Sequence, residues 1–343
     1  MRILVQRYSA LGDIALLLPV LTALKRDQPD VEIHLVSRPF IKSLVDDLDI
    51  HFHAADLKGQ HKGFFGLWRL AVQLKRKANP NLIIDAHNVL RSRILNSFFR
   101  LLGLKVYRVN KEREARRGLV RKENKIVKPL KHSSIKYAET LRRAGLKFNF
   151  SEKDKALYPV KASLSPELLS PEAKYHLGIA PMAKHQAKRY PLAQMQKVLA
   201  HYNSNSDYHF YLFGGAEEAK ELEALGKAAK INFTVIAGKL KFPEEIALMR
   251  KLHLMLAMDS SNMHLAALAG IKIISIWGAT HPLAGFSPIG NHTSLMVQVP
   301  REDLTCRPCS VFGNKECFRG DYACLNRLTP AKVIATIDAA LIT

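Results

Sequence analysis

No apolar run in this sequence reaches the length of a membrane-spanning helix, which excludes an integral membrane protein built on such helices. We also expect no secretory signal peptide, because Asp13 and Pro19 interrupt the leucine-rich N-terminal segment and no small-residue cleavage site precedes Lys25-Arg26. We therefore expect a cytoplasmic protein. Association with a membrane surface stays open.

Two further patterns are missing. The G-x-G-x-x-G fingerprint does not follow the first expected strand, where Leu11-Gly12-Asp13 stands instead, and this argues against an NAD(P)-dependent oxidoreductase. The most basic segment, 105–136, has aromatic residues only at its edges, Tyr107 and Tyr137. Proteins that bind single-stranded nucleic acid interleave such residues as stacking platforms, so nucleic-acid binding is the alternative of a different class and not the preferred one.

Acidic residues are scarce relative to basic ones. The 343 residues include 52 Lys and Arg against 30 Asp and Glu, a net charge of +22, so we expect an anionic partner such as nucleic acid, an acidic membrane or a phosphorylated substrate. Residues 1–173 carry +16 and the remainder +6. The segment 105–136, which includes Arg113, Arg116 and Arg117, concentrates this charge and is predicted to be a patch for an anionic substrate or surface.

The first half alternates short apolar segments with amphipathic ones, a pattern typical of a parallel sheet with helices on both faces. The expected strands are 2–6, 31–36, 50–53 and 81–86. The expected helices are 14–27, 40–46, 64–78 and 91–101, with another from His132 to Gly145.

Two aspartates follow strands of this expected sheet. Gly12 and Asp13 lie on the turn from the first strand to the first helix, and Asp85 precedes His87 at the end of another strand. Ligands of open α/β sheets bind at the carboxyl ends of the strands. Asp13 is therefore either a general base or a helix cap, and the segment 85–88 is either a second loop of the same site or a plain turn.

The length of 343 residues favours two domains. The segment 147–172 is the expected linker, and the α/β pattern resumes after it. The expected strands are 176–180, 208–213, 232–236, 253–257 and 271–276, and the expected helices are 191–203, 216–229, 243–251, 261–269 and 330–341. We expect domains at 1–160 and 161–329, with a cleft between the carboxyl edges of their sheets.

Four strand-to-helix connections of the second half are candidate parts of that cleft. The first is basic, with Lys184, Lys188 and Arg189 available for a diphosphate, although a solvated loop has the same composition. The second is Phe213-Gly214-Gly215, with Glu218 just beyond it as a candidate for ribose hydroxyls.

The third connection runs from Asp259 through Ser260 and Ser261 into a helix of small residues that contains His264. Free N–H groups and the positive end of the helix dipole favour an anion there, and an ordinary capped helix is the alternative. The fourth connection contains Thr280, His281 and Pro282. A histidine at such a place is more often structural than catalytic.

The four cysteines are confined to one segment and form a C-x2-C-x7-C-x6-C array: Cys306, Cys309, Cys317 and Cys324. The first pair has zinc-ligand spacing, whereas the second lacks the usual C-x2-C form. A cytoplasmic location argues against disulfides. Structural zinc and free thiols both stay open.

Taken together in order and spacing, these motifs resemble the lipopolysaccharide heptosyltransferases of glycosyltransferase family 9 over nearly the whole chain. The resemblance rests on Gly12-Asp13 with Pro19, on Asp85-Ala86-His87-Asn88 with Arg91-Ser92, on Lys188-Arg189-Tyr190-Pro191, on Phe213-Gly214-Gly215, on Asp259 to Ala266, on Trp277-Gly278-Ala279-Thr280 and on the cysteine-bearing tail.

The resemblance implies a GT-B fold, in which two Rossmann-like α/β/α domains face each other across a cleft. The acceptor would bind the N-terminal domain and the nucleotide sugar the C-terminal domain, and the helix in 330–343 would cross back to the first domain. It also implies an inverting transfer without a metal or other cofactor. The donor would be ADP-L-glycero-D-manno-heptose, and the acceptor an anionic, lipid-linked inner-core lipopolysaccharide at the cytoplasmic face of the inner membrane.

The resemblance also implies roles for single residues. Asp13 would be the general base, and Lys188 would stabilise the departing diphosphate together with the helix start at Ser260 and Ser261. Asp259, His264 and Glu218 would bind other parts of the donor. The expected acceptor-binding residues are Gly12, Asp85, His87, Arg113, Arg116 and Arg117.

Two departures from the family pattern concern the donor. Met182-Ala183-Lys184 stands where small hydroxyl residues are common, and Ser260-Ser261-Asn262-Met263 stands where a Thr-Gly pair is common. A transferase that uses another nucleotide sugar for a different surface glycan is therefore the alternative within the same class.

Overall fold

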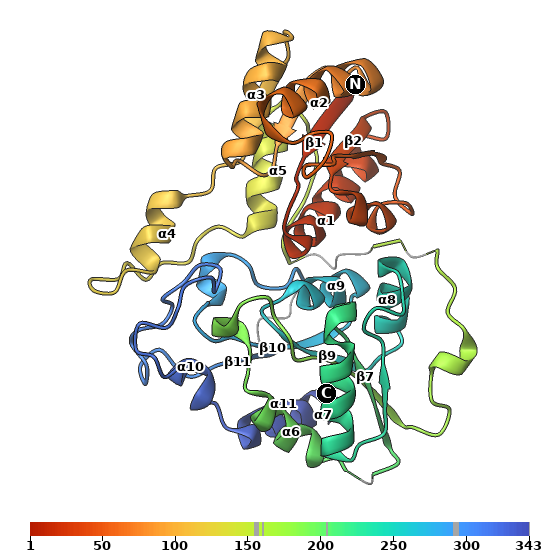
Figure 1. The fold of residues 1–343 in the computed structure, drawn as a ribbon, viewed down its shortest axis with the longest axis vertical. Coiled ribbons are helices and arrows are strands. Elements are labelled where there is room, and N and C mark those ends of the chain that lie inside the picture. Colours follow the sequence, from red (N-terminus) through yellow and green to blue (C-terminus); the bar gives the residue numbers. More distant parts are fainter. Residues whose placement is uncertain (154–157, 160, 204, 291–294, 343) are drawn as a thin grey trace. The chain divides into compact units, whose positions relative to one another are not determined.

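The computed structural model describes residues 1–153, 158–159, 161–203, 205–290 and 295–342 and divides them into two compact units. The first unit comprises Met1–Lys111 and Ser133–Glu152, and the second comprises Glu112–His132 and the chain from Lys153 onward. Each unit is built on one parallel sheet with helices packed against it (Figure 1). The predicted class, two α/β units with parallel sheets, is confirmed.

The sheet of the first unit has the order β3-β2-β1-β4-β5, and all its strand pairs are parallel. β1 is central because Ile3, Leu4 and Val5 are apolar on both faces, and all three are fully buried. The strands are β1 (Arg2–Gln6), β2 (Glu32–Ser37), β3 (His51–Ala54), β4 (Leu82–Asp85) and β5 (Lys105–Arg108).

The helices of the first unit pack in pairs, α2 against α3 and α1 against α5 (Figure 1). The first pair covers an apolar cluster that includes Leu4, Ile83 and Phe99. The helices are α1 (Leu11–Asp27), α2 (Gly63–Ala78), α3 (Leu90–Leu101) and α5 (Ser133–Arg143), and Pro39–Leu44 forms a short 3-10 helix, η1.

The sheet of the second unit has the order β11-β10-β9-β6-β7-β8 and is again parallel. Its strands are β6 (Tyr175–Ala180), β7 (Tyr208–Leu212), β8 (Phe233–Val235), β9 (Leu254–Met258), β10 (Lys272–Ile276) and β11 (Met296–Val297).

The helices of the second unit also form groups, with α6, α7 and α11 over one apolar cluster and α8 packed against α9. The longer ones are α6 (Leu192–Ala200), α7 (Ala219–Ala229), α8 (Phe242–Met249), α9 (Ser261–Ala269) and α11 (Pro330–Ile342). The shorter elements are α4 (Arg113–Leu119), α10 (Ala323–Asn326) and the 3-10 helices η2 (Pro166–Leu168), η3 (Gln186–Lys188), η4 (Ala216–Glu218) and η5 (Pro282–Ala284).

Several elements differ from the sequence-based expectation, among them the short helices α4 and α10, which the sequence did not predict. The expected helix 40–46 is the 3-10 helix η1, and the sequence did not predict β5 or β11. Both strands are short and lie at the edges of their sheets. An edge strand of two to four residues is too short to show a hydrophobic period.

Most of the basic segment lies in a different unit from the one that the expected domain boundary gives it. The prediction placed it within 1–160, whereas Glu112–His132 belongs to the second compact unit. Several contacts within the second unit hold it there, including the following. The Arg116 guanidinium lies over the rings of Phe286 and Phe312, at 5.2 and 5.6 Å from their centroids, and the N–H of Leu130 donates to the carbonyl of Leu283 at 2.9 Å.

Two other boundary predictions are only partly covered by the described residues. The expected linker 147–172 includes residues 154–157 and 160, which lie outside them, as does Thr343 of the expected segment 330–343. Helix α11 packs on α6, β10 and β11. Its crossing to the first domain stays a prediction.

Within the described part of the chain, no helix combines the length and the apolar character that crossing a bilayer requires.

Candidate active site

Asp13 lies in the first turn of α1, just beyond the carboxyl end of the central strand β1. The helix begins at Leu11 with Gly12 buried as its second residue, and the Ala10 N–H donates to Asp13 Oδ2 at 3.2 Å. The capping interpretation is therefore correct in part, because the carboxylate satisfies one free backbone donor of the helix start. The same carboxylate also has contacts that capping does not require.

A buried arginine holds Asp13. Arg7, whose side chain is 7 % exposed, places Nη2 2.5 Å from Asp13 Oδ2, and the Asp13 side chain is 19 % exposed. Arg7 Nη1 donates to the hydroxyl of Tyr137 at 2.9 Å, and this hydroxyl lies 3.4 Å from Asp13 Oδ1. Burial opposes the charge on Arg7, but the adjacent carboxylate raises the pKa of Arg7 above its ordinary value.

The turn at Asp13 and the segment after β4 meet at the same edge of the sheet, as the sequence predicts. Gln6 pairs in register with Asp85, and Arg7 Nη1 donates to the carbonyl of Ala86 at 2.5 Å. Ser9 Oγ lies 3.3 Å from His87 Nε2. Burial, followed by the charge of Arg7, lowers the pKa of His87 to about 3, so this imidazole is neutral at physiological pH.

Asp85 itself is fully buried. Its Oδ1 accepts from the N–H groups of His87 and Asn88, at 2.9 and 2.7 Å, and its Oδ2 accepts from Ser92 Oγ and Asn96 Nδ2, at 2.9 and 2.7 Å. Four hydrogen bonds use most of the acceptor capacity of a carboxylate. Asp85 therefore organises the loop that presents His87, and its predicted direct contact with an acceptor stays a prediction.

The second unit has its own charged pair at the carboxyl edge of its sheet. β6, β7, β9 and β10 end at Ala180, Leu212, Met258 and Ile276, so the four predicted connections follow strand ends of one sheet. Lys188 Nζ lies 2.9 Å from Asp259 Oδ2 and donates to the Asp259 carbonyl at 2.9 Å. The Lys188 side chain is 16 % exposed and the Asp259 side chain is 7 % exposed, so the pair is largely buried. A ligand phosphate can compete with the Asp259 carboxylate for the Lys188 ammonium.

Helix α9 begins directly after this pair. Ser260 is its N-cap residue, yet its hydroxyl makes no capping hydrogen bond and is buried without a partner among the described residues. Ser261 opens the helix and His264 is buried one turn further on. The hydroxyl of Thr280, just beyond β10, is likewise buried without a partner within the described chain. Buried polar groups normally have partners, so these two hydroxyls are candidates for hydrogen bonds to a ligand.

Glu218 holds the glycine turn after β7. Its Oε2 accepts from the Gly215 N–H at 2.8 Å, and its Oε1 lies 3.8 Å from Arg189 Nη2. The exposed Lys184 is on the same loop as Lys188. Glu218 thus joins two of the predicted connections, and its contact with a ribose stays a prediction.

The three arginines predicted to bind the acceptor all lie on α4. Arg113 and Arg117 are exposed, while Arg116 is held by its ring contacts within the second unit. Their role in binding the acceptor stays a prediction.

The described residues contain one group of three or more side chains arranged like metal ligands, and it is Glu32, His34 and His51 rather than the cysteines. The four cysteines are not paired as disulfides. Burial raises the pKa of the Cys324 thiol to about 12, so this sulfur is protonated and unreactive in the structure as it stands.

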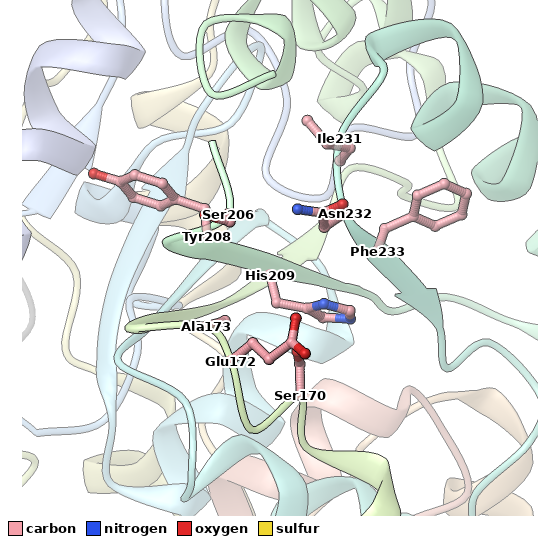
Figure 2. A pocket seen from close by; sticks show the side chains of 9 residues that line it. All are labelled: Ser170, Glu172, Ala173, Ser206, Tyr208, His209, Ile231, Asn232 and Phe233. Atoms are coloured by element: carbon pink, nitrogen blue, oxygen red, sulfur yellow. The ribbon is translucent and has the colours of Figure 1, made fainter. Parts of the chain in front are cut away.

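A polar hollow of about 430 Å³ lies at the amino ends of the strands of the second sheet (Figure 2). Its lining comes from the amino ends of β7 and β8 and from the segment before β6: Ser170, Glu172, Ala173, Ser206, Tyr208, His209, Ile231, Asn232 and Phe233. Because it lies at the amino ends of the strands, it is separate from the edge that bears Lys188 and Asp259.

Sequence reasoning missed two residues of the site, Arg7 and Tyr137. Arg7 could have been found, since a charged residue directly after a buried strand needs a partner. Tyr137 could not, because it lies 124 residues from Asp13 in the chain.

Comparison with known proteins bears on both units. The family model of glycosyltransferase family 9 (heptosyltransferase) matches residues 67–314. A curated relative, lipooligosaccharide heptosyltransferase 2 of Campylobacter jejuni, is 28% identical over 207 residues, which cover 59% of this chain and 62% of the relative.

Solved structures share the fold over nearly the whole chain. A family 9 glycosyl transferase from Veillonella parvula has a TM-score of 0.76 at 19% identity and covers 99% of this chain and 97% of its own. The E. coli heptosyltransferase WaaC, solved with ADP-2-deoxy-2-fluoro heptose, has a TM-score of 0.67 at 15% identity and covers 99% of each chain. These similarities confirm the predicted GT-B fold, and the match of the family model over most of the sequence shows that this chain belongs to glycosyltransferase family 9, the heptosyltransferase family.

Proposed function

We propose that this protein is an inverting, metal-independent glycosyltransferase that moves a heptose from ADP-heptose to an anionic, lipid-linked lipopolysaccharide inner-core acceptor. It acts in the cytoplasm, at the face of the inner membrane. The observation that carries the proposal is the carboxylate of Asp13, held by the buried Arg7 at the carboxyl end of β1. Membership of the heptosyltransferase family and the relative that is a lipooligosaccharide heptosyltransferase support it.

In the proposed reaction, Asp13 accepts the proton of the acceptor hydroxyl. The hydroxyl oxygen forms a bond to the anomeric carbon of the donor sugar, the bond from that carbon to the diphosphate breaks, and ADP leaves with the electron pair. Attack from the face opposite the leaving group inverts the anomeric centre. Arg7 fixes the orientation of the Asp13 carboxylate, which in this scheme faces the acceptor hydroxyl.

On the donor side, Lys188 turns from Asp259 to the departing diphosphate, whose growing negative charge it offsets. The start of α9 adds backbone N–H groups and the positive end of a helix dipole, beside the unpartnered hydroxyl of Ser260. In this scheme Ser261, His264 and Asp259 hold the sugar or phosphates, and Glu218 holds the ribose. WaaC of E. coli was solved with an ADP-heptose analogue, which supports the choice of donor.

On the acceptor side, Gly12, Asp85 and His87 form the proposed sugar site of the first unit, with Asp85 acting through the loop that it holds. Arg113, Arg116 and Arg117 are the proposed contacts to acceptor phosphates or to anionic lipid. The net charge of +22 supports an anionic acceptor at a membrane surface.

The experiment compares transfer with donor binding in Asp13→Asn. Asparagine keeps the shape but cannot take the proton, so we expect kcat to fall by about 10²- to 10⁴-fold while the affinity for ADP stays within twofold. Asp27→Asn, the same change at the far end of α1, is the matched control. Retention of full activity in Asp13→Asn would exclude this base.

A thermal-shift panel identifies the ligand class. It compares ADP, ADP-heptose, GDP, UDP, NAD and duplex DNA at fixed salt, since a ligand at about 100 times its dissociation constant adds about 2.7 kcal/mol to stability. We expect a rise with ADP and ADP-heptose. A rise with GDP or UDP alone would change the donor, and a response to NAD or DNA alone would overturn the proposal.

A further inference from the structure

Four polar side chains share one face at the edge of the first sheet. β2 and β3 are parallel neighbours, with His34 opposite His51 and Val36 opposite His53. Residues two apart on a strand point to the same face. Glu32 and His34 of β2 therefore lie on the same face as His51 and His53 of β3.

The ligand atoms of three of these residues converge. Glu32 Oε1 lies 3.0 Å from His34 Nε2 and 3.6 Å from His51 Nε2, and one ligand atom from each of the three residues lies within 4.8 Å of the other two. The rings of His34 and His51 are stacked at a centroid distance of 4.8 Å. Two imidazole nitrogens and one carboxylate oxygen are the donor set that borderline divalent metals prefer.

Two further residues contact the other polar atoms of Glu32 and His34 and so orient the ligand atoms. Arg2 Nε donates to Glu32 Oε2 at 2.7 Å, which leaves Oε1 facing the imidazoles. His53 Nε2 lies 2.8 Å from His34 Nδ1. When His34 Nδ1 carries the proton and donates it to His53, the lone pair of His34 Nε2 is available to a metal. Hydrogen bonds of this kind, made to the ligand side chains from outside the coordination shell, are typical of metal sites in proteins.

We propose that Glu32, His34 and His51 bind one divalent transition-metal ion, Zn²⁺ in the first instance, with His53 and Arg2 as positioning residues. The buried His34 anchors the site, since its side chain is 6 % exposed. The His51 side chain is 59 % exposed, so water completes the coordination shell. The bound ion ties the four-residue edge strand β3 to β2.

This site is separate from the proposed chemistry. Glu32 pairs in register with Arg2, at the amino end of β1, whereas Asp13 follows the carboxyl end of that strand. In this proposal the ion is structural and takes no part in the proposed transfer.

The test uses the full-length, tag-free protein after treatment with a chelator. Zn²⁺ is titrated by calorimetry, bound metal is counted by elemental analysis, and Co²⁺ serves as a spectroscopic probe. We expect one equivalent of Zn²⁺ that raises the melting temperature. The matching Co²⁺ complex is expected to show visible d–d bands without the near-ultraviolet charge-transfer band of a thiolate, which distinguishes this site from the cysteines.

The decisive variant is His51→Ala, since an exposed side chain is removed with little effect on folding. It should lose one equivalent of metal and the metal-dependent rise in melting temperature, while the metal-free melting temperature stays the same. His53→Phe keeps a ring but not the nitrogen and should weaken binding by about 10- to 100-fold. His201→Ala removes an exposed imidazole of the second unit as the matched control. Equal metal content in His51→Ala and the unaltered protein would overturn the proposal.

Discussion

The Lys188 ammonium contacts two oxygens of the same residue, the side-chain Oδ2 and the main-chain carbonyl of Asp259, each at 2.9 Å. This double contact links the loop after β6 to the end of β9, immediately before α9. The lysine is thereby held at the start of a helix, where a diphosphate would also meet free backbone N–H groups.

The first prediction concerns Lys188→Met. The substitution leaves the Asp259 carboxylate buried without its cation, so we expect the free energy of unfolding to fall by about 3 kcal/mol. Under the proposed function, the affinity for ADP also falls, by about 10- to 150-fold, as expected for the loss of a hydrogen bond to a charged group. Urea denaturation and calorimetry measure the two effects.

Lys184→Met is the control for that prediction, since Lys184 is an exposed lysine on the same loop. It should leave stability and ADP affinity nearly unchanged. If both variants lose the same affinity, the loop acts through its total charge, and a specific role for Lys188 is wrong.

The second prediction concerns the coupling of Arg7 and Asp13. Because both side chains are largely buried, a double-mutant cycle of Arg7→Met and Asp13→Asn should give a coupling free energy of about 1–3 kcal/mol in urea denaturation. The neighbouring pair Arg26 and Asp27, with Arg26 62 % exposed, should give less than about 1 kcal/mol. Equal couplings for the two pairs would show that Arg7 is not specifically engaged with Asp13.

The arrangement of residues at the carboxyl ends of the first unit's strands was largely predictable, because it depends on topology. Apolar strands separated by helices give parallel pairing, and parallel pairing brings the residues after β1 and β4 to one edge. The contacts of Asp13 were not predictable, since Tyr137 comes from α5, after the chain has passed through Glu112–His132 of the second unit. No local sequence pattern indicates that Tyr137 will contact Asp13, because the contact depends on the path of the chain between them.

The basic segment also has one property that the sequence predicts and one that it does not. Its charge is evident in the sequence, but its assignment to the second unit depends on packing of Arg116 against Phe286 and Phe312. Similarly, Lys188 was singled out for a diphosphate, whereas its partner Asp259 lies 71 residues away. Side-chain pairs of this separation follow from the completed fold.

The third prediction concerns Arg307, which is fully buried. Its guanidinium donates to the carbonyls of Gly278, Trp277 and Thr280, at 2.7, 3.1 and 3.2 Å, and so holds the loop after β10. Arg307→Met leaves these carbonyls without a donor, and we expect a loss of about 3–5 kcal/mol in unfolding free energy, measured in urea. Arg319→Met, which removes an exposed arginine of the same C-terminal segment, should change stability by less than about 1 kcal/mol. A small effect of Arg307→Met would show that other contacts maintain the loop.

The fourth prediction concerns the pH dependence of stability through Glu245, on α8. Its side chain is buried, and burial raises the pKa of its carboxyl to about 8, against about 4.3 in the unfolded chain. A raised pKa in the folded state means that the native protein binds more protons between about pH 4.3 and pH 8, so stability falls as pH rises through this range and then levels off. The loss reaches about 5 kcal/mol when the carboxyl is fully ionised.

Glu245→Gln isolates this effect, because the amide keeps the shape without the charge. The variant should match the unaltered protein in unfolding free energy near pH 4 and exceed it near pH 9, in urea denaturation at a series of pH values. Glu221→Gln, on the exposed face of α7, should follow the unaltered protein throughout. If the curves of Glu245→Gln and the unaltered protein stay parallel from pH 5 to 9, the carboxyl is already solvated in the folded state and its burial does not control the pH dependence.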